Sequence, residues 1–215
     1  MVGCHMTVTE ICGPSSPSML SLEALVGPSS PDSPLSRTLA ILFEPSPILF
    51  CILEPQLQAS LTTVARGITS YADLVGLSIS QIQSWDKDLQ ALFIAAHPRI
   101  GENKNLSALS ANEQGATVPT SLEVLNRLAH LNACYEKRYP GLRYIIFVDG
   151  RSRAAVAEVM EDQLGFAHSL SPSEPAIGEV LSVDIGGEEW TLELNRAVQD
   201  VGRIAKSRLI SLGLE

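Results

Sequence analysis

The segment from about 121 to 139 limits this chain most, because its apolar residues recur at helical rather than strand spacing. Thr120 and Glu123 have the spacing of a capping box at a helix start. One stripe follows, made of Leu122, Leu125, Leu128, Leu131, Tyr135 and Tyr139. Such a stripe must be buried against other elements, and it packs most simply on further helices. The pattern therefore favours an all-α fold.

Helical spacing recurs along most of the chain after residue 33. Ser33 is a candidate N-cap and Pro34 a first helical residue. The spacing predicts further helices at about 57–66, 70–76, 86–96, 151–164 and 188 to the end. Residues 144–148 form the one extended run, and a lone strand cannot make a sheet. We predict a compact all-α domain of about eight helices, with at most one short extended segment near 143–149.

Two segments depart from this pattern. Residues 1–33 carry clusters of Pro, Ser and Gly, which predict a flexible arm before a helical domain at 34–215. Residues 166–187 are interpreted as an insertion loop. Their apolar positions before Gly186 and Gly187 fit the first arm of a hairpin equally well, so both interpretations stay open.

Composition excludes several classes of partner. Of the 215 residues 45% are hydrophobic and 18% charged, which is enough apolar material for a core. The net charge is -9 and the basic residues are scattered, so we expect no nucleic-acid partner. The apolar run 48–53 is too short to span a bilayer, so we expect no membrane partner. A homodimer is compatible with the pattern.

The cysteines and the chain end bear on metal binding and location. The spacing of the four cysteines matches neither a zinc site nor a disulfide framework, so we expect reduced thiols and no metal site. We expect a soluble cytoplasmic protein. The sequence 212–215 is not a peroxisomal Ser-Lys-Leu type of address, although entry into peroxisomes with a partner stays open.

His97 is the histidine whose position is unusual. It follows an apolar helix face and precedes Pro98, which pushes the backbone of His97 out of the helical region. Its imidazole therefore lies at a helix exit, where it either caps the last carbonyls or takes part in chemistry. His130 and His168 are interpreted as solvent-exposed.

Other polar motifs have structural explanations of their own. Ser110 and Glu113 have capping-box spacing, which needs no function. Asn132 lies on a mostly apolar seam, as either a satisfied core amide or a ligand contact. The sequence Asp-Gly-Arg-Ser at 149–152 is interpreted as an ordinary turn.

Five short motifs nevertheless occur in a distinctive order. They are Phe-Glu-Pro-Ser-Pro at 43–47, Ala-His-Pro-Arg-Ile-Gly-Glu at 96–102, Ser-x-x-Glu-Gln at 110–114, Leu-Asn-x-x-Tyr-Glu at 131–136, and Tyr-Ile-Ile-Phe-Val-x-Gly-Arg-Ser at 144–152. Together they resemble the 2-oxo-4-hydroxy-4-carboxy-5-ureidoimidazoline (OHCU) decarboxylase family over about residues 35–212. The sequence Tyr-Pro-Gly-Leu-Arg-Tyr at 139–144 is most similar to fungal members.

The resemblance implies an all-helical, cofactor-free enzyme of purine catabolism. Its small-molecule substrate would be OHCU, formed by urate oxidase and 5-hydroxyisourate hydrolase, and its product (S)-allantoin. The resemblance assigns catalysis to His97 and Glu113. It assigns substrate contacts to Pro98, Ser110, Gln114 and the main chain near Ile145 and Ile146.

The implied chemistry suits these residue types. Loss of CO2 leaves an electron pair that the substrate ring can delocalise, so no metal or electron-sink cofactor is required. We expect His97 to deliver a proton to one face of the ring or to orient the leaving carboxylate. Glu113 is expected to fix the ring and to raise the pKa of His97.

One position departs from the family. Gln163 aligns with an arginine that clamps the ligand, and losing such a charge-assisted contact costs about 1.5 to 3 kcal/mol. Arg99, Arg151 or Arg196 could substitute, the alignment could shift around 166–187, or activity could be reduced. A homologue that binds a ureide without turnover, and a purely helical scaffold, are the alternatives.

Overall fold

The computed structural model describes residue 25 and residues 33–63, 68–102, 109 and 120–214. These residues form seven α-helices and no strand, which confirms the all-α prediction. A π-helical turn, η2 (Leu49–Leu53), leads into α2, and a 3-10 turn, η3 (Ile177–Glu179), lies in a long loop. The α-helices are α1 (Pro34–Leu42), α2 (Glu54–Thr63), α3 (Tyr71–Gln83), α4 (Lys87–Ala95), α6 (Leu122–Arg138), α7 (Arg153–Leu164) and α8 (Glu188–Ser211).

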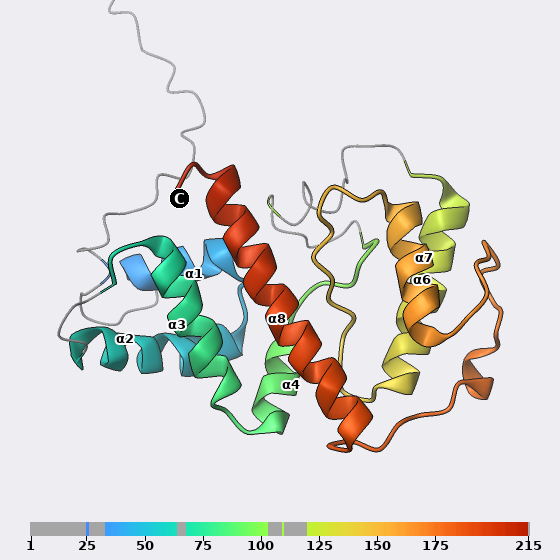
Figure 1. The fold of residues 1–215 in the computed structure, drawn as a ribbon, viewed down its shortest axis with the longest axis horizontal. Coiled ribbons are helices and arrows are strands. Elements are labelled where there is room, and N and C mark those ends of the chain that lie inside the picture. Colours follow the sequence, from blue (N-terminus) through green and yellow to red (C-terminus); the bar gives the residue numbers. More distant parts are fainter. Residues whose placement is uncertain (1–24, 26–32, 64–67, 103–108, 110–119, 215) are drawn as a thin grey trace, which may run out of the picture.

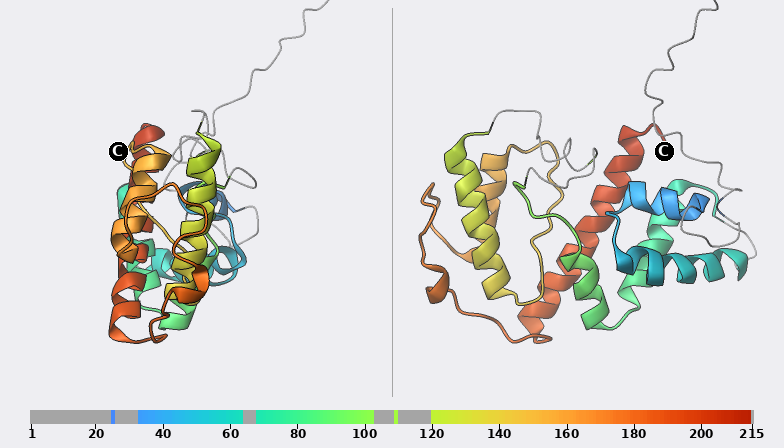
Figure 2. Two further views of the ribbon diagram at one scale, coloured as in Figure 1. Left: turned by 90° about the vertical axis from the view of Figure 1, so that its right-hand side faces the viewer. Right: turned by 180° about the vertical axis from the view of Figure 1, so that it is seen from behind.

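The long helix α8 organises the molecule. With 24 residues it spans about 36 Å. It packs against α1, α3 and α4, while α6 and α7 pack on each other as a pair (Figure 1). The view from behind shows α8 running between these two groups, with the chain at 142–150 beside it (Figure 2). Residues on one stripe of α8, from Trp190 to Leu209, are buried in the core.

Capping side chains set the helix starts. Ser33, Ser70, Asp86, Ser121 and Ser152 each accept a hydrogen bond from the main-chain N–H three residues later. The predicted capping box at Thr120 is therefore wrong by one residue. The predicted stripe of α6 is buried from Leu128 onward, but its first residue, Leu122, is 71% exposed, and Val124 is buried at that end instead.

Two helix boundaries differ from prediction for physical reasons. α3 continues past Gly76 to Gln83, although an interior glycine costs about 1 kcal/mol relative to alanine. Burial of Ile82 and packing on α8 offset that cost. α2 begins at Glu54, three residues before its predicted start, where Ser33 Oγ donates to Glu54 Oε1 at 2.8 Å.

The segment 166–187 is a loop containing η3, so the hairpin interpretation is wrong. A buried ion pair joins Arg127 to Glu161, and Arg127 Nη1 donates to the carbonyl of Ser171 at 2.8 Å. His130 is buried against the carbonyl of Pro175, which overturns the prediction that it is exposed. His168 is exposed as predicted.

Most of the predicted arm at 1–33 lies outside the described residues. The two described positions within it are Leu25, which is buried in the core, and Ser33, which caps α1.

Candidate active site

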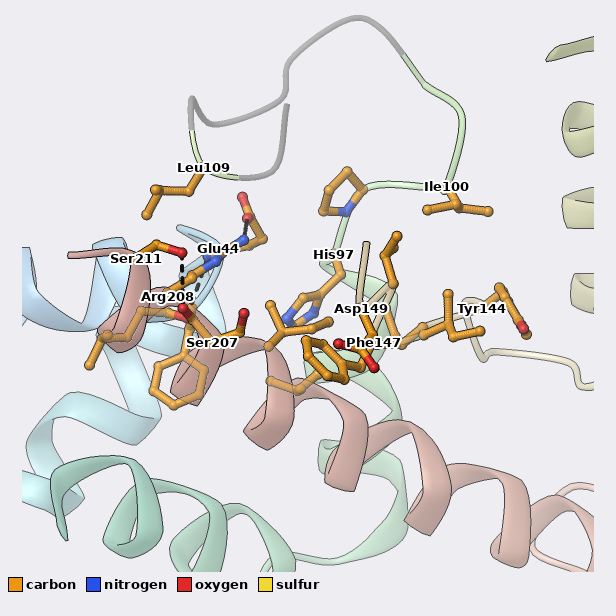
Figure 3. A pocket seen from close by; sticks show the side chains of 18 of the residues that line it. Glu44, His97, Ile100, Leu109, Tyr144, Phe147, Asp149, Ser207, Arg208 and Ser211 are labelled. Atoms are coloured by element: carbon orange, nitrogen blue, oxygen red, sulfur yellow. Dashed lines mark hydrogen bonds and ion pairs between the residues drawn. The ribbon is translucent and has the colours of Figure 1, made fainter. Parts of the chain in front are cut away.

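A cavity of about 420 Å³ lies where five parts of the chain meet. Its walls are the C-terminal half of α8, the break after α1, the exit from α4, Leu109 and the extended segment 144–150. Figure 3 shows Arg208 and Glu44 toward one end, Tyr144 and Ile100 toward the other, and His97 between them. Apolar side chains such as Phe43 and Ile204 make up much of the lining.

His97 is held by the end of α4. The helix ends at Ala95 because Pro98 cannot continue it. Nδ1 of His97 lies 3.0 Å from the carbonyl oxygen of Phe93. The rings of the two residues pack edge to face, with their centroids 5.1 Å apart. A carbonyl only accepts, so Nδ1 carries the proton and Nε2 is left as an acceptor. His97 therefore caps its helix and lines the cavity at the same time.

Burial controls the charge of His97. The side chain is only 7% exposed, and loss of solvation lowers the pKa of His97 to about 4. The imidazole is therefore neutral at neutral pH. This direction is opposite to the expected rise in pKa, and Glu113, to which that rise was attributed, lies outside the described residues.

Arg208 brings a cation to the cavity. Its Nη2 binds Glu44 Oε1 at 2.7 Å, and its Nη1 donates to the carbonyl of Ile41 at 3.2 Å. Both members of the ion pair are buried and line the cavity. Glu44 is presented by the break that follows α1. Among the described residues that line the cavity, Arg208 is the one arginine.

A tight turn ends the extended wall. Asp149 and Gly150 have φ of 50° and 72°, and the N–H of Arg151 donates to the carbonyl of Val148 at 3.0 Å. Positive φ at both central residues makes a type I′ turn, for which Asp-Gly is a preferred pair. Ser152 then caps α7. The interpretation of 149–152 as a turn is confirmed.

Comparison with protein families adds a finding to this geometry. The family model described as OHCU decarboxylase matches residues 30–171. The chain belongs to the OHCU decarboxylase family. No curated protein matches the chain. The matched range contains His97, Glu44 and the extended wall, whereas Arg208 on α8 follows it.

The structure brings together four of the residues that the family resemblance singled out. His97, Pro98, Ile145 and Ile146 all line the cavity. Three others, Ser110, Glu113 and Gln114, lie outside the described residues, so their roles stay predictions.

Gln163 lies elsewhere. Its Nε2 donates to Glu193 Oε2 at 2.6 Å, and it does not line the cavity. The proposed substitutes for the missing family arginine do not line the cavity either. Arg99 pairs with Glu136, Arg151 binds the main chain at 147–148, and Arg196 pairs with Glu193. The arginine that does line the cavity is Arg208, which was not among the residues singled out from the sequence. Its signal was a charge on the apolar stripe of α8, beside Ala205 and Leu209.

Asn132 is a core amide. Its Nδ2 donates to the carbonyls of Ile100 at 2.9 Å and Leu128 at 2.8 Å, so it supports the chain that follows His97 rather than lining the cavity. Within the described ranges, no group of three His, Cys, Asp or Glu side chains could hold a metal ion. Every helix with described structure is too short or too polar to cross a membrane.

Proposed function

We propose that the chain decarboxylates OHCU to (S)-allantoin in urate breakdown without a cofactor. The family match supports this activity, and one structural observation carries it: a neutral imidazole of defined tautomer lies in the same cavity as a buried guanidinium. The first group can move a proton and the second can bind a carboxylate.

The proton steps follow from the tautomer of His97. The bond between the ring carbon and the carboxylate breaks, CO2 leaves, and the ring delocalises the electron pair onto nitrogen, which takes a proton from solvent. Nε2 then accepts the proton of the hydroxyl as that group becomes a carbonyl. The imidazolium returns this proton to the adjacent ring carbon on one face, which gives a single enantiomer. His97 thus acts as a proton shuttle, with one solvent proton consumed in each turnover.

Arg208 is the proposed carboxylate ligand. Charge-assisted hydrogen bonds from a guanidinium suit a planar anion. Glu44 already compensates the charge of Arg208, so the pair orients the carboxylate without the full attraction of an uncompensated cation. Moderate attraction suits catalysis, because tight binding of the ground-state anion would oppose the loss of its charge. Glu113, Ser110 and Gln114 would complete the site as the resemblance implies.

The test is circular dichroism of a coupled reaction. Urate oxidase and the hydrolase generate OHCU, and the chain is added to the fresh intermediate. Rapid formation of dextrorotatory allantoin is expected. The His97→Asn variant should remove this activity, whereas His168→Asn, the same change at an exposed histidine, should retain it.

Slow decay to racemic product at the spontaneous rate would refute the proposal. If the chain still bound allantoin in calorimetry, the alternative of a ureide-binding homologue without turnover would replace it. Wild-type rates in the His97→Asn variant would refute the proton shuttle while leaving the decarboxylase activity intact.

A further inference from the structure

The extended wall of the cavity is held along one edge by side chains instead of a partner strand. Arg196 Nη1 donates to the carbonyl of Ile145 at 2.8 Å. The N–H of Phe147 donates to Asp200 Oδ2 at 3.4 Å. Both bonds come from side chains of α8 and reach odd-numbered residues. Arg151 binds the carbonyls of Phe147 and Val148, at 2.8 and 2.9 Å, where the segment enters its turn. In extended backbone the N–H and C=O of one residue share an edge, and the next residue uses the opposite edge.

The opposite edge therefore belongs to Ile146. Within the part of the chain that the structure describes, no hydrogen bond to the N–H or C=O of Ile146 is present. Ile146 also lines the cavity. Ile146 is half-buried, and its N–H and C=O have no partner among the described residues, so a ligand or water can bind them. One N–H beside one C=O complements a cyclic ureide, whose ring amide offers the reverse pair.

Arg196 lies at the centre of the supporting edge. Its guanidinium binds Glu193 Oε1 at 2.6 Å and Asp200 Oδ2 at 2.9 Å while it reaches Ile145. It also stacks over the Tyr144 ring at 5.4 Å. The two carboxylates are buried and lie on α8 one turn to either side of Arg196. This bracing fixes the direction of the guanidinium, and with it the rotation of the extended segment about its own axis.

The family resemblance already implies substrate contacts to the main chain near Ile145 and Ile146. We propose that Arg196, braced by Glu193 and Asp200, is the positioning residue that holds this segment so that the N–H and C=O of Ile146 face the cavity. The ureide part of this inference rests on the proposed function. Arg196 does not itself touch the substrate. It replaces the neighbouring strand that would otherwise hold the segment in register.

The test compares Arg196→Gln with Arg203→Gln. Both remove one positive charge from α8, but Arg203 is 67% exposed and binds Asp200 at 3.4 Å from the surface. Arg196→Lys is the conservative variant, because it keeps the charge near Glu193 while one ammonium group cannot span Glu193, Asp200 and Ile145 together. It keeps the test valid if Arg196→Gln fails to fold.

Hydrogen exchange of the ligand-free protein is measured first. Arg196→Lys should speed exchange at 144–148 about tenfold, the equivalent of one lost hydrogen bond, and leave α3 and α6 unchanged. With OHCU as substrate, KM should rise about tenfold while kcat and the pH profile change little, since His97 is untouched. A variant that only unfolds part of the protein would lower kcat at constant KM. Arg203→Gln should match wild type in both measurements.

Unchanged exchange at 144–148 in Arg196→Lys would overturn the inference, and so would faster exchange with an unchanged KM. If the wild-type chain has no decarboxylase activity, the proposed function fails separately. Calorimetry with (S)-allantoin then decides the ligand half: weaker binding by Arg196→Lys than by Arg203→Gln supports it, and equal binding or none refutes it.

Discussion

The buried ion pair between Glu44 and Arg208 allows a prediction whose magnitude follows from burial. In Glu44→Gln the carboxylate is lost beside a guanidinium that is only 3% exposed. Breaking a buried pair by removing one partner costs about 3 to 5 kcal/mol. The introduced amide can still accept from Arg208, which also keeps its bonds to the carbonyls of Ile41 and Leu42. We therefore expect the lower end, about 3 kcal/mol, which corresponds to a Tm lower by about 6 to 12 °C.

The matched control is Glu189→Gln. Arg138 and Glu189 lie as close together, at 2.6 Å, but Glu189 is 51% exposed. An exposed pair contributes less than about 1 kcal/mol. Urea unfolding followed by far-UV circular dichroism gives both free energies, and an unchanged m-value shows that the denatured state is comparable. Equal losses in the two variants, or a loss below about 1 kcal/mol in Glu44→Gln, would refute the reasoning from burial.

Three further predictions concern the site. As pH falls from 6.5 to about 4, the unfolded chain binds a proton at His97 while the native state does not, so the free energy of unfolding should fall by about 3 kcal/mol. Urea titrations at several pH values should show this decrease in the wild type and not in His97→Asn. An equal decrease in both would contradict the buried neutral imidazole. Gln163→Ala should lower the free energy of unfolding by about 1 kcal/mol through the lost hydrogen bond to Glu193, and KM should not change. A raised KM would show instead that Gln163 contributes to substrate binding. Glu113→Ala should raise KM and lower stability by about 1 kcal/mol, the usual contribution of a helix cap. Steady-state kinetics and thermal unfolding measure the two effects. An unchanged KM would refute a role for Glu113 in substrate binding.

Local signals in the sequence were sufficient for much of the fold. The Asp149-Gly150 turn, the Ser33 cap and the helix exit at His97 each depend on residues within a few positions, so their conformations could be predicted. The boundary of α3 could not, because burial of Ile82 against other elements outweighs the local preference of Gly76.

The features that could not be predicted from the sequence depend on residues far apart in the chain. Arg208 meets Glu44, which is 164 residues earlier, and no local pattern reports such a contact. His130 was misjudged for the same reason, since the loop that covers it returns 45 residues later. The charge of His97 depends on how deeply it is buried, which periodicity does not measure.

The proposed recognition of substrate through the main chain of Ile146 also affects how the site tolerates mutation. Every amino acid except proline supplies the same main-chain N–H and C=O. Substitutions at Ile146 that preserve the extended backbone therefore leave both hydrogen-bonding groups in place. Side chains proposed to bind the substrate directly, such as Arg208, have no such protection. Substitutions at Ile146 are therefore expected to alter side-chain packing before they alter substrate selectivity. Substrate selectivity should be more resistant to mutation at this wall than at the end of the cavity that contains Arg208.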